Sequence, residues 1–178
     1  SLYGEGGGGG GPGHTRQLGL DLLASQSRLE ADGPVLIAQL FAGQEAVALD
    51  QLIAAGDPSM TIIPPIDQLR SSYLFMTPTT YAADYVTVAV PGDVDLLLDG
   101  VIVDLINMGE VGVDPFLVEQ PTAIGDSQWV RYTIRLSDGA HRLESAQPGV
   151  AFSASVYAFD AFVSYAYPGG MNLAKAAQ

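Results

Sequence analysis

The sequence predicts an all-β fold, an antiparallel β-sandwich or jelly-roll-like domain with an extended glycine-rich N-terminal arm. The chain has 21 glycines and 11 prolines among its 178 residues, which is typical of a chain rich in turns. The apolar 48% is rich in Val, Ile, Leu and Tyr, and together with the glycines and prolines this mixture favours strands and turns over helices. Short apolar or alternating segments also recur between turn signals about every 8–12 residues, as in sandwiches and barrels.

The arm comprises residues 1–13 and contains an unbroken glycine run, Gly6, Gly7, Gly8, Gly9, Gly10 and Gly11, followed by Pro12. Ordering one backbone residue costs about 1–2 kcal/mol, and glycine has no side chain whose contacts could offset that cost. We therefore expect an ordered arm to pair its backbone with a sheet. That sheet could belong to a neighbouring subunit or to the same domain; a linker held only by a chance contact is the third interpretation.

The rest of the chain, residues 14–178, is predicted to be a sandwich domain, either single or built from two packed halves, 14–80 and 81–178. The apolar run GPVLIAQLF at 33–41 predicts a strand that is buried on both faces. Residues 44–56 fit either a short helix that ends at a glycine or an irregular excursion. Prolines then end two predicted strands, in SMTIIPPIDQ (59–68) and SSYLFMTP (71–78).

The carboxyl-terminal half predicts one long strand, two hairpins and two further strands. The long strand at 84–92 alternates, with Val86, Val88 and Val90 on one face. The hairpins are expected at 94–104, where Asp99-Gly100 makes the turn, and at 127–143, where Asp138-Gly139 makes it. The two further strands are expected within 149–170, with a break near Asp160.

Charge and composition narrow the function classes. The chain carries 20 acidic and 7 basic residues, a net charge of −13, which opposes binding to nucleic acids and to anionic lipid surfaces. It contains no cysteine, so disulfides and thiolate metal sites are absent. No apolar run is long enough for a membrane-spanning helix, so no membrane insertion is predicted. Because the chain starts at Ser1 without a leader, we expect a processed or trimmed product.

No arrangement of residues indicates catalysis, and we predict a non-enzymatic domain without a cofactor. The two histidines, His14 and His141, do not have the spacing of a metal site, and His141 is expected at the rim with a backbone partner. Asp93 and Asp95 are weak candidate ligands for a Ca²⁺ ion, against the alternative of a solvated, edge-protecting charge pair.

Tyrosines near the carboxyl terminus are the candidate contacts for a ligand or a partner protein. Tyr165 and Tyr167 share one strand face, and Tyr157 lies on the preceding strand. Two interpretations are open: the rings fill the sandwich core and its corner, or they form an exposed strip that stacks on sugars or on a partner subunit.

Several landmarks in order along residues 33–173 resemble a known family: GPVLIAQ, GDPSM, YLFMTP, YVTVAVP, LDG, LSDGAH and GVAFSASVYAFDAFVSYAYPGG. They are similar to the domain named after the N-terminal region of the IgG-Fc-binding protein, in its bacterial versions. The resemblance covers only the carboxyl part of that domain, because the glycine-rich arm replaces its upstream region. It implies an extracellular, all-β, non-enzymatic domain of a secreted or surface protein, and no ligand or functional residue is carried over from it.

Taken together, the sequence predicts an extracellular or cell-surface β-sandwich with a structural or adhesive role. The arm suggests that it self-associates as a subunit or module of a filament or surface array. The alternative is a glycan- or protein-binding module, with or without Ca²⁺.

Overall fold

The computed structural model describes residues 29–41, 43, 56–103 and 117–173. Among them, strands predominate, and the only helical element is a short 3₁₀ turn, η1 (Ile66–Gln68). The antiparallel all-β sandwich is therefore confirmed. The glycine-rich arm and residues 44–55 lie outside the described part of the chain, so the interpretations of both segments stay predictions.

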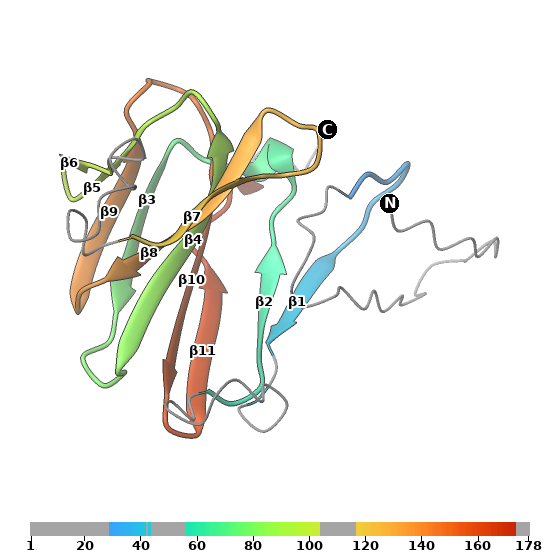
Figure 1. Ribbon diagram of the computed structural model, residues 1–178. Coiled ribbons are helices and arrows are strands. Elements are labelled where there is room, and N and C mark those ends of the chain that lie inside the picture. Colours follow the sequence, from blue (N-terminus) through green and yellow to red (C-terminus); the bar gives the residue numbers. More distant parts are fainter. Residues whose placement is uncertain (1–28, 42, 44–55, 104–116, 174–178) are drawn as a thin grey trace.

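Two sheets form the sandwich (Figure 1). The five-stranded sheet has the order β11 (Val163–Pro168), β10 (Ser153–Asp160), β4 (Ala83–Pro91), β8 (Trp129–Leu136), β7 (Leu117–Ala123). The four-stranded sheet has the order β3 (Ser72–Thr77), β9 (Gly139–Ser145), β5 (Leu96–Leu98), β6 (Val101–Ile102). A separate hairpin of β1 (Ile37–Phe41) and β2 (Ser59–Ile63) lies beside β11.

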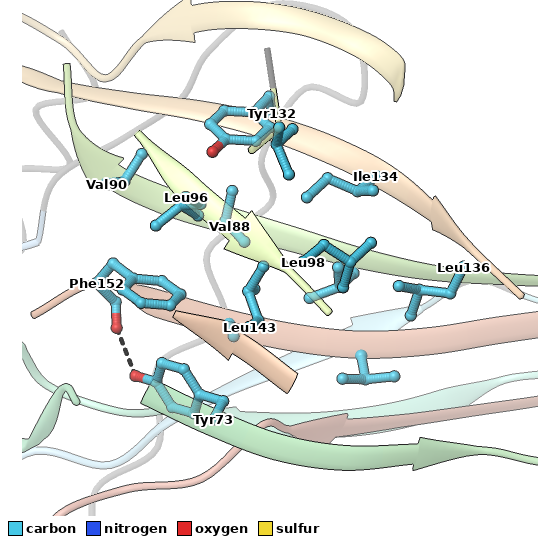
Figure 2. Close-up of a cluster of buried hydrophobic side chains, with 14 of the residues drawn as sticks. Tyr73, Val88, Val90, Leu96, Leu98, Tyr132, Ile134, Leu136, Leu143 and Phe152 are labelled. Atoms are coloured by element: carbon cyan, nitrogen blue, oxygen red, sulfur yellow. Dashed lines mark hydrogen bonds between the residues drawn. The ribbon is translucent and has the colours of Figure 1, made fainter. Parts of the chain in front are cut away.

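The core fills the space between the two sheets, as the alternation in β4 predicts. Val86, Val88 and Val90 are fully buried, and in the register of β4 with β8 they face Ile134, Tyr132 and Val130. Figure 2 shows the two sheets contributing interleaved side chains, among them Leu96 and Leu143 from the smaller sheet. Such burial contributes about 25 cal/mol per Å² of apolar surface, and it is the main force that holds the sheets together.

Hydrogen bonds of Tyr73 tie neighbouring loops to the core. The Tyr73 hydroxyl donates a hydrogen bond to the backbone oxygen of Phe152, drawn as a dashed line in Figure 2, and it accepts one from the Arg70 N–H at 3.0 Å.

The turn that joins β5 to β6 is of a type that needs positive φ at both central residues. Asp99 and Gly100 occupy these positions, with φ of 52° and 83°. The predicted hairpin at 94–104 is confirmed. The two strands predicted within 149–170 are also confirmed: β10 ends at Asp160, and it forms a hairpin with β11.

The predicted hairpin at 127–143 is wrong. β8 pairs with β4 and β7, whereas β9 pairs with β3 and β5, so the chain passes from one sheet to the other through Ser137 and Asp138. The face assignment is correct, because Tyr132, Ile134 and Leu136 are buried. The alternation of apolar residues in β8 and β9 fits equally well whether the two strands pair with each other or lie in different sheets. A short turn sequence does not distinguish a hairpin from a crossover between packed sheets.

The predicted burial of residues 33–41 is also wrong. β1 is a strand, but Val35 is 58% exposed, Leu36 is 79% exposed and Leu40 is 69% exposed. An uninterrupted apolar run is typical of a strand covered on both faces. Here the five-stranded sheet covers only the inner face of the hairpin.

Candidate functional site

One end of the sandwich contains a group of polar side chains in and beside the apolar core. We call Asp84, Asp99, His141 and Tyr165 the Asp84–His141 cluster. Asp84 is the first inward-facing residue of β4 and is 2% exposed. The Tyr165 hydroxyl, from β11, donates a hydrogen bond to Asp84 Oδ1. This bond joins two strands that are not neighbours, because β10 separates them.

Burial controls the ionisation of this first pair. Desolvation raises the pKa of Asp84, the hydrogen bond from Tyr165 offsets part of that rise, and the charges of Asp138 and His141 act in opposite directions. The pKa of Tyr165 is also raised, first by burial and then by its hydrogen bond to Asp84 and by the charge of that carboxylate. The tyrosine therefore keeps its proton and remains the donor.

His141 forms the second half of the cluster. It is 4% exposed, and its Nδ1 lies 2.8 Å from Asp99 Oδ2 while its Nε2 lies 2.7 Å from the backbone oxygen of Ser137. Both neighbours are acceptors, so the doubly protonated imidazolium can donate to both. His141 thereby connects the β5–β6 turn to the crossover between β8 and β9.

Asp99 is fixed from three directions. Its N–H donates to the backbone oxygen of Arg142 at 2.8 Å, its Oδ1 accepts the Arg142 N–H at 2.8 Å, and its Oδ2 faces His141. Desolvation alone would raise the pKa of Asp99, but the hydrogen bonds from Arg142 and His141 and the charge of His141 outweigh it, so the pKa is lowered.

The cluster has the chemistry of a structural hydrogen-bond network. A nucleophilic triad needs a hydroxyl at the histidine nitrogen that is not held by the aspartate, but at His141 a backbone oxygen occupies that position. The nearby Thr77 hydroxyl lies 2.7 Å from the same Ser137 oxygen, to which it donates. Among the described residues, no three His, Cys, Asp or Glu side chains gather as metal ligands. The cluster therefore fixes loops and strands at this end of the core.

The structure places the candidate tyrosines on two opposite faces. Tyr165 and Tyr167 pair with Ala158 and Val156 of β10, so they point inward and pack against the core. The Tyr167 hydroxyl donates to the backbone oxygen of Met76 at 2.6 Å. These contacts favour the core interpretation for both residues, and their role as ligand contacts stays a prediction.

Tyr157 points away from the core, on the outer face of the five-stranded sheet. Its ring stacks on Tyr85 with centroids 5.4 Å apart and contacts Phe41 of β1 at 5.6 Å. Phe159 extends the group, with its ring 6.4 Å from that of Phe41. The outer aromatic residues therefore form the surface on which the β1–β2 hairpin is anchored.

The two candidate calcium ligands lie in the turn between β4 and β5. Asp93 and Asp95 are both exposed, and their backbone oxygens accept hydrogen bonds from Gln147 Nε2 at 3.0 Å and from the Ala146 N–H at 2.9 Å. These bonds involve backbone oxygens, so they hold the turn and leave the carboxylates out of the network. Calcium binding there stays a prediction. The other candidate segment, Gly6–Pro12, lies outside the described residues.

The β1–β2 hairpin carries a surface that the sequence prediction missed. With Phe41 turned toward the outer aromatic residues, alternation turns Leu36 and Leu40 the other way, and Leu40 pairs with Met60 of β2. Leu36, Leu40 and Met60 are 79%, 69% and 57% exposed. We call these three residues the hairpin face. Neither 35–41 nor 59–63 contains an ionisable residue, and this lack of charge was the signal available in the sequence.

A second exposed apolar pair lies on the four-stranded sheet. Leu74 and Met76 of β3 are 75% and 67% exposed, and Leu74 pairs with Arg142 of β9. Arg142 forms an ion pair with Glu144 at 2.7 Å on the same strand. Charged groups thus neighbour these apolar residues, unlike those of the hairpin face.

Comparison with known proteins gives one family match. The family model described as IgGFc binding protein matches residues 17–158, so it includes residues upstream of the landmarks noted in the sequence and ends within β10. No curated protein and no solved structure matches the chain. Within the described residues, no helix is long and apolar enough to cross a membrane.

Proposed function

Because the chain belongs to the family of IgGFc binding proteins, an extracellular, binding-type family of β domains, we propose that it is a non-enzymatic adhesive module of a surface protein, and that it binds a protein partner through the hairpin face. The observation that carries this proposal is the exposure of Leu36, Leu40 and Met60 on one face of a hairpin with no ionisable residue at 35–41 or 59–63. Contiguous exposed apolar surface of this kind marks interaction sites in soluble proteins.

Two properties of the hairpin suit it to this role. It is anchored on the sandwich, because Phe41 packs on Tyr157 and the Gly56 N–H donates to the Asp160 backbone oxygen at 2.8 Å. The hairpin face itself points away from that anchor. A rigid apolar surface loses little conformational freedom when it binds, which favours affinity.

The experiment measures binding of the purified chain to immobilised IgG Fc fragment, which the family's name suggests as a first probe, and to a glycan array with and without EDTA. We expect Leu40→Lys to abolish protein binding, whereas the matched variant Leu74→Lys, with the same charge change at an equally exposed leucine of β3, retains it. Protein binding that survives Leu40→Lys contradicts the proposal. Glycan binding that EDTA removes supports the alternative, a calcium-dependent glycan-binding module.

A filament or surface-array role is the second part of the proposal and rests on the arm. The run Gly6–Gly11 in the arm gains order only by pairing of its backbone, because glycine has no side chain to bury. Deleting residues 1–13 and examining assembly by electron microscopy tests this role. Assemblies that are unchanged by the deletion contradict it.

A further inference from the structure

β1 presents a strand edge with which no other described strand pairs. β1 and β2 form a sheet of their own, in which β2 is the strand next to β11 (Figure 1). The Ser164 hydroxyl of β11 donates to the Asp57 backbone oxygen at the start of β2, which fixes that order. Within the described part of the chain, the other side of β1 therefore carries backbone N–H and C=O groups that pair with no strand, and a further strand can add there.

The other sheet edges carry features that hinder pairing. β7 contains Pro121 and two irregularities in its register with β8, and β6 is only two residues long. On β3, the Met76 backbone oxygen already accepts the Tyr167 hydroxyl. Proline, bulges and short length are the usual means by which edge strands avoid association. β1 has none of them: its sequence is IAQLF, and all five residues pair with β2 in regular register.

Charge indicates which partner suits this edge. The chain has a net charge of −13, so two copies repel each other over most orientations. They can approach most closely where each lacks charge, and the hairpin has no ionisable residue at 35–41 or 59–63. A basic partner is attracted to the acidic remainder of the chain, and it finds no carboxylate at 35–41 or 59–63. A second copy brings the same uncharged, apolar edge.

We propose that two copies of this chain associate by antiparallel pairing of their β1 strands about a two-fold axis. The pairing gives a continuous four-stranded sheet in the order β2, β1, β1, β2, with Leu40 and Met60 of both copies on its outer face. An isologous contact of this kind closes on itself and gives a dimer. This inference rests on the proposed function, since it names a second copy as the partner of the hairpin that carries the hairpin face.

Sedimentation velocity over a series of protein concentrations tests the proposal on the full chain. We expect a weak monomer–dimer equilibrium, because one strand pair buries less than the roughly 1,200 Å² of a stable interface. Added NaCl should shift it toward dimer by screening the repulsion between like-charged chains. A chain that stays monomeric at all concentrations and salt levels overturns the proposal.

Leu40→Lys places a charge beside the paired edge and should leave the chain monomeric. Leu74→Lys changes the net charge equally and should leave the equilibrium as it is. Loss of dimer in both variants, or in neither, overturns the proposal. If the parent chain is monomeric and still binds Fc fragment through the hairpin face, the proposed function stands while this inference falls.

A proline pair separates backbone pairing from side-chain contact. N–H groups alternate in direction along a strand, so one of Ala38→Pro and Gln39→Pro removes a bond to β2 and the other removes only an outward N–H. The variant that keeps the melting temperature of the parent is the outward one, and it should be monomeric. A dimer that persists in that variant overturns pairing through β1.

Discussion

The Asp84–His141 cluster and the hairpin face are opposites in burial: the cluster places polar groups in or beside the core, and the hairpin face exposes apolar groups to solvent. In the cluster, two acids and a histidine lie in or beside the core, and each has a hydrogen-bond partner. On the hairpin face, three large apolar side chains lie in solvent without a described neighbour to cover them. Satisfied polar groups inside a core hold a fold together, whereas uncovered apolar groups outside it favour association.

The comparison separates stability from recognition. Disrupting the cluster should lower the free energy of unfolding and leave the surface unchanged. Altering the hairpin face should change association and leave the free energy of unfolding almost unchanged. Each prediction below tests one side of this separation, beginning with the largest expected effect.

His141→Ala should cause the largest loss. The variant leaves the Ser137 oxygen and Asp99 without their shared donor, and it opens a cavity at a position that is 4% exposed. Together these effects should lower the free energy of unfolding by about 2–4 kcal/mol. Urea denaturation followed by Trp129 fluorescence measures the loss. A value below about 0.5 kcal/mol, the range of ordinary surface substitutions, would mean that the cluster does not hold this end of the sandwich.

Tyr165→Phe should have the next largest effect, about 1–3 kcal/mol at neutral pH, because it leaves the buried carboxylate of Asp84 without its donor. The loss should become smaller in acid, where Asp84 is protonated and no charge needs compensation. Tyr81→Phe is the matched control: Tyr81 packs edge-on against Tyr165, with centroids 4.8 Å apart, and its substitution leaves the Tyr165–Asp84 hydrogen bond in place. Equal losses for both variants at every pH would contradict the assignment.

Asp84 itself should give a pH dependence of defined sign. Its pKa in the folded state is raised above the ordinary value of 3.8, so the folded chain binds that proton more tightly than the unfolded chain. The contribution of Asp84 to stability is therefore full below 3.8 and falls as the pH rises through the folded pKa. Asp84→Asn keeps an acceptor for Tyr165 and removes this fall, so it should be more stable than the parent at neutral pH. A pH profile of thermal stability that matches the parent's would contradict the prediction.

Asp99 should give a pH dependence of stability that has the opposite sign to that of Asp84 and is smaller. Its pKa is lowered in the folded state, so its contribution is present above the ordinary value of 3.8 and is lost as the pH falls through the folded pKa. Asp99→Asn should cost less than about 1 kcal/mol at neutral pH, because the Asp99 side chain is 47% exposed and solvent screens the pair. Asparagine tolerates the positive φ of 52°, so the turn is preserved. Urea titrations of parent and variant at neutral and acidic pH should therefore converge in acid.

The sequence predicted where the strands lie better than it predicted which strands pair with each other. The alternation of Val86, Val88 and Val90 correctly identified β4 and its buried face, and Asp99-Gly100 correctly identified a tight turn. Alternation depends only on local spacing, whereas sheet membership depends on residues far along the chain. For this reason the segment around Asp138 was interpreted as a hairpin although it crosses between sheets.

The candidate site was harder to predict for the same reason. His141 was expected at the rim with a backbone partner; the partner is confirmed, but the residue is buried, because Asp99 and Ser137 meet it only after the two sheets pack. No local pattern marks Asp84, because it lies near the end of an alternating strand, where a polar residue does not interrupt the alternation. The exposure of Leu40 could not be predicted from an apolar run that fits a buried strand equally well.

The smallest effect on stability should come from Met60→Lys. Met60 is 57% exposed and lies across β1–β2 from Leu40, where no described side chain covers it, so the free energy of unfolding should change by no more than about 0.5 kcal/mol. The same substitution places a charge in the centre of the hairpin face and should remove binding of a protein partner through that face, because a lysine that loses water in an apolar contact has no carboxylate at 35–41 or 59–63 to pair with. Urea denaturation and binding to the immobilised Fc fragment, measured on one preparation, give both quantities. Unchanged unfolding with lost binding separates the two regions by function, while a large loss of stability would show that the hairpin face belongs to the fold and not to recognition.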